Sequence, residues 1–229
     1  MQYQFNNFAY YFTTMIKNIL FDLGGVILNI DFQRSATKFK DIGIDNFNQL
    51  YSRAVQESLF EKLEMGLITD KIFYNEIRKL SKLPITDQQI EKAWNALILD
   101  FPQQRLALLQ EIGRNYRCFL LSNTNGIHYT AYQNDLREKH SIDGLESLFE
   151  KSWYSHKLQM RKPNKDIFTF ALSDAAIEAK DTLFIDDSIQ NIETAKSLGI
   201  KTLFIDISKG KEIAHYFTNG KITNDEASH

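Results

Sequence analysis

Short apolar runs separated by longer stretches of helical periodicity are the feature that most constrains the fold of this chain. Such runs suit buried strands, whereas apolar residues repeated every three or four positions suit amphipathic helices. The runs that we predict as strands are Ile19 to Phe21, Cys118 to Leu121, Phe149 to Tyr154, Thr182 to Ile185 and Thr202 to Ile205. Because strands that alternate with helices form parallel sheets with right-handed crossovers, the sequence predicts an α/β protein with a doubly wound parallel sheet.

Residues 31–101 differ from the rest of the chain because their pattern is helical throughout. Thr69 is placed to cap one helix, and Thr86 with Gln89 three residues later forms a capping box for another. We therefore predict an all-helical insertion in the α/β core. The predicted division is an extension without assigned function over residues 1–14, a core over 15–30 and 102–229, and the insertion over 31–101.

Composition and charge limit the classes of partner. A hydrophobic content of 43% with 24% charged residues is typical of a soluble globular protein, and the net charge of −2 favours neither nucleic acid nor an anionic membrane. Cys118 is the only cysteine, so no disulfide can form within the chain, and its apolar neighbours predict a buried thiol. We find no secretory signal and no apolar run of membrane-spanning length, and so expect a cytoplasmic protein. The oligomeric state cannot be predicted.

Asp22 is the first polar residue after the first apolar run, and Gly24 and Gly25 allow a tight turn beyond it. Open α/β sheets bind ligands at the carboxyl ends of their strands. Asp22 is therefore the first candidate for a nucleophile or a metal ligand, although FDLGG alone fits an ordinary strand that ends in a turn-forming Asp equally well.

Three later stretches bear on this choice. They are LLSN (Leu120 to Asn123), RKPNKDIF (Arg161 to Phe168) and LFIDDSIQN (Leu183 to Asn191). With FDLGG, and in this order, they resemble the motifs of the haloacid dehalogenase-like hydrolase superfamily, whose members are mostly phosphatases with an aspartyl-phosphate intermediate. The D-L-G-x-V form of the first motif is similar to that of a branch with bacterial phosphatases of sugar phosphates, such as glucose 1-phosphate. The resemblance implies a Rossmann-like core and, in residues 31–101, a cap domain that closes over the site.

The resemblance implies that Asp22 attacks phosphorus, while its other oxygen binds a divalent cation. A carboxylate suits this role because water readily cleaves the resulting phosphoanhydride. Lys162, which precedes Pro163 and the start of a predicted helix, would stabilise the charge of the phosphoryl oxygens in the transition state. Ser122 and Asn123 would hold the phosphate with a hydroxyl and backbone N–H groups.

A metal site is expected at Asp186 and Asp187, because adjacent carboxylates at a strand end repel each other unless a cation or proton compensates them. Oxygen ligands favour Mg²⁺. By motif position Asp187 would be the direct ligand, with Asp186 bound more remotely, and the Gly24 carbonyl would complete the protein ligands with Asp22. Asn191, one turn beyond Asp187, would support the site through a hydrogen bond.

Gly24 is a departure from the superfamily pattern. Most of these phosphatases have a second Asp at that position, which protonates the leaving group and activates water, and such catalysis contributes about 100- to 10,000-fold. The D-L-G-x-V branch shares the departure. Two explanations remain open: an anomeric leaving group that needs less protonation, or a proton from a residue of the cap or from His128 or His156.

The leading prediction is a magnesium-dependent phosphatase of a small phosphorylated metabolite, with a sugar phosphate favoured. One alternative is a 2-haloacid dehalogenase, but dehalogenases use no metal, and the Asp186–Asp187 pair argues against one. The other is a non-catalytic phosphoester-binding or regulatory protein, which Gly24 alone supports. The sequence does not identify the substrate. Phe32, Tyr51 and Trp94 are candidates for specificity contacts in the cap, although each also suits a helix core.

Overall fold

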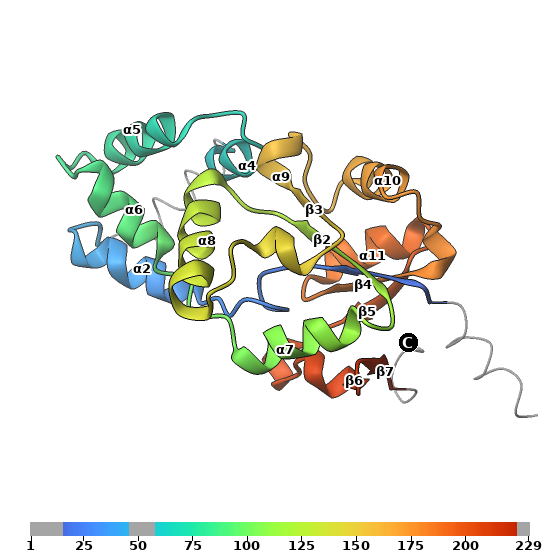
Figure 1. Cartoon of the computed structure of the whole chain (residues 1–229). Coiled ribbons are helices and arrows are strands. Elements are labelled where there is room, and N and C mark those ends of the chain that lie inside the picture. Colours follow the sequence, from blue (N-terminus) through green and yellow to red (C-terminus); the bar gives the residue numbers. More distant parts are fainter. Residues whose placement is uncertain (1–15, 46–57, 224–229) are drawn as a thin grey trace, which may run out of the picture.

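The computed structural model describes residues 16–45 and 58–223, which form a sheet covered by helices and a group of helices at one end (Figure 1). The strands are β1 (Asn18–Phe21), β2 (Arg117–Ser122), β3 (Lys151–Tyr154), β4 (Thr182–Asp186), β5 (Lys201–Phe204), β6 (Phe217–Thr218) and β7 (Lys221–Ile222). The α-helices are α2 (Phe32–Asp41), α4 (Leu59–Glu64), α5 (Asp70–Ser81), α6 (Asp87–Asn95), α7 (Gln103–Ile112), α8 (Gly126–His140), α9 (Ser155–Leu158), α10 (Lys165–Asp174) and α11 (Ile189–Ser197).

The main sheet has the strand order β3-β2-β1-β4-β5, and all its neighbouring strands are parallel. The predicted strands and the predicted sheet type are therefore confirmed. The order runs outward from β1 in both directions, so the β1/β4 boundary is the switch point at which such sheets bind ligands. In the register, Phe21 lies opposite Leu120 on β2 and Ile185 on β4. Asp22 and Asp186 thus leave the sheet side by side.

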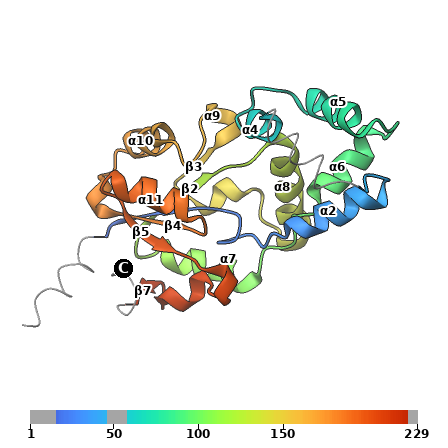
Figure 2. The ribbon, with the colours of Figure 1, turned by 180° about the vertical axis from the view of Figure 1, so that it is seen from behind.

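Helices cover both faces of the sheet, as the two opposite views show (Figures 1 and 2). Successive residues of a strand point to opposite faces. Ile19 and Phe21 pack in a cluster that includes Leu109 of α7, whereas Leu20 packs in a cluster that includes Phe168 of α10. This burial on both faces explains why the strands appear in the sequence as continuous apolar runs.

Helices α2, α4, α5 and α6 form a group that we call the helical lobe, comprising residues 32–45 and 58–95. Their apolar faces share a core of their own, in which Phe39, Phe73 and Trp94 are buried together with Ile127 from α8. Both predicted caps are present: the Thr69 hydroxyl accepts from the Ile72 N–H, and Thr86 with Gln89 forms the capping box. The lobe corresponds to the predicted insertion, and its division from the core as a separate domain stays a prediction.

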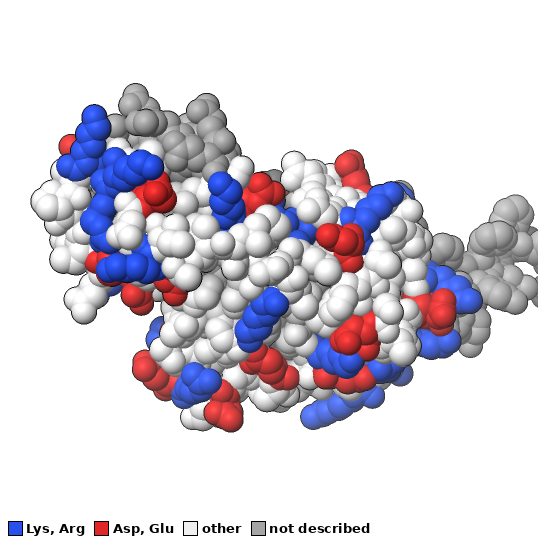
Figure 3. Space-filling model, turned by 90° about the horizontal axis from the view of Figure 1, so that it is seen from above, with Lys and Arg blue, Asp and Glu red and all other residues white. Residues whose placement is uncertain are grey.

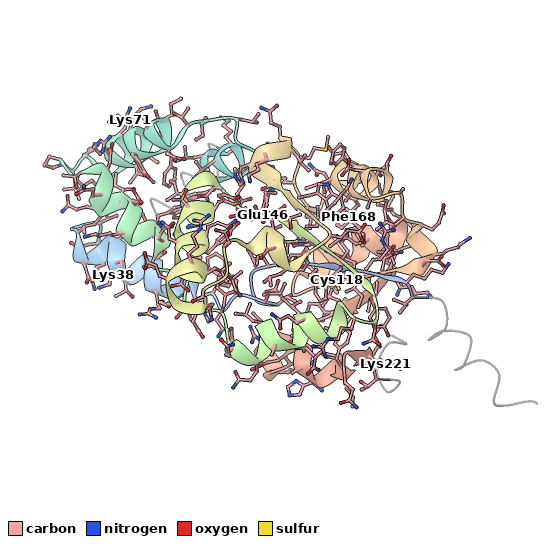
Figure 4. The ribbon with its side chains drawn as sticks, in the orientation of Figure 1. Lys38, Lys71, Cys118, Glu146, Phe168 and Lys221 are labelled. Carbon is pink, nitrogen blue, oxygen red and sulfur yellow. The ribbon has the colours of Figure 1, made fainter. Side chains whose placement is uncertain are left out.

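The helices before and after β4 begin without side-chain caps. Ser188 precedes α11, and its N–H donates to the Asp186 carboxylate at 2.7 Å. Helix α10 begins at Lys165, after Asn164, so Pro163 precedes the helix rather than opening it. Cys118 is buried as predicted, burial raises the pKa of its thiol to about 12, and Figure 4 shows it within the core.

Charged side chains of both signs are interspersed on the face seen in Figure 3. Lys38 and Lys71 lie on the helical lobe, whereas Lys221 lies at the opposite end of the molecule (Figure 4). Among residues 16–45 and 58–223, no helix combines the length and apolar character needed to span a bilayer.

Candidate active site

Asp22 lies at the switch point of the sheet, where its N–H donates to the Ile185 carbonyl at 2.9 Å. Lys162 reaches this position from the segment before α10. Its ammonium Nζ donates to Oδ1 of Asp22 at 2.6 Å and to Oδ2 of Asp186 at 2.7 Å. All three side chains are buried, and Lys162 is only 1% exposed. The structure thus brings together three of the predicted site residues from three separate parts of the chain.

Asn123 holds Lys162 in place through the backbone. Its Nδ2 donates to the Lys162 carbonyl at 2.8 Å, and its Oδ1 accepts from the Lys162 N–H at 2.9 Å. Both ends of the Asn123 amide are therefore used within the protein. The predicted contact of Asn123 with phosphate therefore relies on its backbone N–H, as the sequence suggested, or on the second hydrogen of Nδ2.

Asp22, Asp186 and Asp187 offer carboxylate oxygens that lie within 4.8 Å of one another. The oxygens of Asp186 already accept from Lys162, from the Ser188 N–H, and from Asn191 Nδ2 at 3.0 Å each. Among the described residues, no side-chain hydrogen bond or ion pair engages the carboxylate of Asp187. This contrast fits the expected order of the two residues, with Asp187 as the ligand and Asp186 behind it.

Gly25 is required where the first loop meets this cluster. Its φ of +75° is disfavoured for other residues, and a Cβ there would lie 2.3 Å from Oδ2 of Asp187. The sequence predicted the turn, but not this close approach of the loop to Asp187.

The charge of the cluster fits a divalent cation. Burial raises the pKa of Asp22 to about 7, with Lys162 opposing the shift and the neighbouring carboxylates adding to it. Burial and the charge of Asp186 likewise raise the pKa of Asp187 to about 6. The positive charge of one lysine thus offsets only part of the negative charge of three carboxylates. Carboxylate oxygens are hard donors, which suit Mg²⁺.

The loop after β2 is fixed by Ser155, the first residue of α9. Its hydroxyl accepts from the Thr124 N–H and donates to the Thr124 carbonyl, both at 2.9 Å. Asn125 caps α8 by accepting from the His128 N–H at 3.0 Å. Ser122, at the end of β2, is 2% exposed and borders the same loop. Ser155 was not predicted, because a serine that follows a strand carries no signal of so distant a contact.

A cavity of about 350 Å³ lies between the carboxyl end of the sheet and the helical lobe. Its walls are mainly apolar. The sheet side includes Gly24, Ser122 and Asn123, and the lobe contributes Phe32, Glu64 and Trp94. Phe32 and Trp94 therefore line the same cavity as Gly24 and Ser122, and their role in specificity stays a prediction, whereas Tyr51 lies outside the described residues.

The two candidate histidines are poor proton donors. His128 lines the cavity, stacks on Trp94 with ring centroids 5.0 Å apart, and places Nδ1 2.8 Å from the Asn95 side chain. Burial lowers the pKa of His128 to about 3 and that of His156 to about 4. Both rings are neutral near pH 7.

Replacement of His128 by Gln is expected to reduce the acid sensitivity of the fold. A His whose pKa is lower in the folded protein binds its proton in the unfolded chain first, so stability falls as the pH drops from about 6.5 toward 3. At pH 5 the resulting loss of unfolding free energy is at most about 2 kcal/mol. Denaturant unfolding at pH 7 and pH 5 measures it: the loss of unfolding free energy between these values should be smaller for His128→Gln. An unchanged loss would contradict the assignment.

Ile30 fills the space beside Gly24, where most members of the resembled superfamily carry their second Asp. A Cβ built on Gly24 would lie 3.1 Å from Cδ1 of Ile30, in contact with an apolar group. An acid at this position would therefore have to push the end of the Ile30 side chain aside by a few tenths of an ångström.

Arg161 joins the core to the helical lobe. Its Nη1 lies 3.1 Å from Oε1 of Glu61, and its Nη2 lies 3.0 Å from Oε2 of Glu64, both on α4. Sequence analysis missed these three residues, because charged residues distant in sequence give no sign of pairing.

A family model for haloacid dehalogenase-like hydrolases matches residues 19–205. D-ribitol-5-phosphate phosphatase of Bacteroides thetaiotaomicron is 30% identical over 190 residues, which cover 82% of this chain and 91% of that protein.

Two solved structures extend the comparison. A haloacid dehalogenase family enzyme of B. thetaiotaomicron, in complex with magnesium and inorganic phosphate, has a TM-score of 0.80 and 37% identity, and the match covers 89% of this chain and 100% of that one. L-2-haloacid dehalogenase of Xanthobacter autotrophicus has a TM-score of 0.57 and 19% identity, with coverage of 83% and 78%, and shows a shared fold alone. The matched family model and the 30% identity to D-ribitol-5-phosphate phosphatase show that the chain belongs to the haloacid dehalogenase-like hydrolases and is an enzyme of that family.

Proposed function

We propose that this hydrolase is a magnesium-dependent phosphatase of small sugar or polyol phosphates, and that Asp22 carries the phosphoryl group as an aspartyl phosphate. The observation that carries the proposal is the position of Asp22 at the switch point, bonded to Lys162 and within one oxygen cluster with Asp186 and Asp187. A buried nucleophile beside a fixed cation is what phosphoryl transfer requires.

Asp22, Asp187 and the Gly24 carbonyl would hold magnesium, with Asp186 behind them. Magnesium there would neutralise the charge that otherwise repels a phosphate from the carboxylates. Lys162 would orient Asp22 and bear on the phosphoryl oxygens, while Asn191 would keep Asp186 in place. Ser122 and the backbone of the loop fixed by Ser155 would bind the phosphate. A magnesium and phosphate complex of a similar enzyme supports this assignment.

The helical lobe would act as the cap that encloses the substrate. The cavity of about 350 Å³ suits a small organic phosphate, since ligand pockets measure roughly 300 to 1,000 Å³. A related protein acts on D-ribitol 5-phosphate, an ester of a primary alcohol, which extends the favoured class from anomeric sugar phosphates to polyol phosphates.

Phosphate release from a panel of sugar phosphates, polyol phosphates and an aryl phosphate, together with halide release from a 2-haloacid, tests the proposal. We expect release from at least one sugar or polyol phosphate, and we expect its loss when EDTA removes magnesium and its return when magnesium is restored. A colorimetric phosphate assay measures both.

Two other results would overturn the proposal. Halide release without a metal would favour a dehalogenase. Tight binding of phosphate esters, measured by calorimetry, without release from any of them would favour a non-catalytic binding protein.

A further inference from the structure

Gly24 leaves the proposed reaction without its usual proton-transfer group, and the apolar side chain of Ile30 borders that place. An alkoxide leaving group, such as the primary oxygen of a polyol phosphate, is strongly basic and needs a proton as it departs. The inference below rests on the proposed function and asks which side chain supplies that proton.

The described residues that line the cavity include three with titratable side chains: Glu64, His128 and Tyr132. His128 is neutral near pH 7 because burial lowers its pKa to about 3. The hydroxyl of Tyr132 is fully buried, and burial raises its pKa well above the ordinary value. Neither group exchanges a proton readily near neutral pH, which leaves Glu64.

Glu64 lines the cavity from the helical lobe and is paired with the segment that carries Lys162. Nη2 of Arg161 lies 3.0 Å from its Oε2, and Arg161 directly precedes Lys162, which bonds Asp22. The side chain of Glu64 is 30% exposed, so the carboxyl group is not sealed from the cavity that it lines.

The pKa of the Glu64 carboxyl is shifted in the direction that suits a general acid. Burial raises the pKa of Glu64 above its ordinary value, and Glu61 adds to the shift, while Arg161 and Lys162 oppose it. A general acid works best when its pKa approaches the working pH.

We infer that Glu64, carried by the helical lobe, replaces the missing acid and base of the first motif. As an oxygen of Asp22 bonds to phosphorus and the ester P–O bond breaks, the Glu64 carboxyl gives its proton to the leaving alkoxide. Glu64 then takes a proton from the water that attacks phosphorus, the bond from phosphorus to Asp22 breaks, and inorganic phosphate leaves. Glu64 ends protonated and Asp22 free, so the cycle is balanced.

The test is Glu64→Gln, which preserves the size of the side chain. With an alkyl phosphate that the wild type hydrolyses, we expect kcat to fall by about 100- to 10,000-fold. p-Nitrophenyl phosphate needs no proton for its leaving group. Rapid mixing of the variant with it should release a burst of about one nitrophenolate per active site, followed by slow turnover as the aspartyl phosphate accumulates.

Glu61→Gln is the matched control, because Glu61 lies on the same helix and pairs with the same Arg161. It retains Glu64 and the pair of Glu64 with Arg161, so it should show no burst and should lose far less activity than Glu64→Gln. Equal losses on alkyl and aryl phosphates without a burst would show that Glu64 only secures the lobe, and would overturn the inference. The same burst in His128→Gln but not in Glu64→Gln would assign the role to His128 instead. A wild type that hydrolyses no phosphate ester would overturn the proposed function itself.

Discussion

Asp22→Asn is expected to lower phosphate release by roughly 10⁴- to 10⁶-fold, the scale seen when a catalytic nucleophile is removed. An amide is a very weak nucleophile, and no neighbouring carboxylate can take its place. Asp186 bonds Lys162, Asn191 and the Ser188 N–H. The carboxylate of Asp187 lies against Gly25 of the first loop. The measurement is steady-state phosphate release at saturating magnesium with the best panel substrate.

The fold should survive this substitution. Burial and repulsion raise the pKa of Asp22, so a neutral amide at this position relieves a charge that the folded protein tolerates poorly. We expect the melting temperature of Asp22→Asn, without magnesium, to equal or exceed that of the wild type. A folded variant with more than about a tenth of wild-type turnover would rule out Asp22 as the nucleophile, since loss of a nucleophile costs far more.

Lys162→Met is expected to lower the free energy of unfolding by about 3 to 5 kcal/mol, the usual result of removing one partner from a buried ion pair. Lys162 is 1% exposed and bonds both Asp22 and Asp186, so its removal leaves two buried carboxylates without their cation. Met fills a similar volume, so the loss reports charge rather than packing. Denaturant unfolding without magnesium gives the value.

A double variant tests whether Lys162→Met loses stability because buried carboxylates are left unpaired. Adding Asp22→Asn to Lys162→Met removes one of the stranded carboxylates, so it should restore part of the lost stability. The difference from the sum of the two single effects measures the coupling between the residues. Additive effects would mean that Lys162 stabilises the fold through its other contacts and not through Asp22.

The sheet and the proximity of the main candidate residues were predictable because their signals are local. A continuous apolar run that ends in a polar residue, as at Asp22 and Asp186, marks both the strand and its functional end. Once the strands are parallel and adjacent, their carboxyl ends must meet, so the proximity of Asp22 to Asp186 follows from topology. The capping signals at Thr69 and Thr86 are equally local and were also correct.

The remaining features depend on contacts between residues far apart in sequence. The amide of Asn123 bonds the backbone of Lys162, and no local pattern distinguishes this from a contact with phosphate. The packing of Ile30 against Gly24 depends on how the first loop folds back. The pairing of Arg161 with α4 depends on where the lobe rests, which the composition of the helices does not specify.

Arg161 and Lys162 have a consequence for enzyme engineering. Neighbouring residues on one segment bind opposite sides of the cavity: Lys162 binds the carboxylates at the sheet, and Arg161 binds the acidic pair on the lobe. A lobe transplanted from a relative would therefore bring new walls, but without acids equivalent to Glu61 and Glu64 it would lose its charged attachment to the segment that carries Lys162. Chimeras designed to change substrate range should keep these two acids and vary the apolar wall around Phe32 and Trp94.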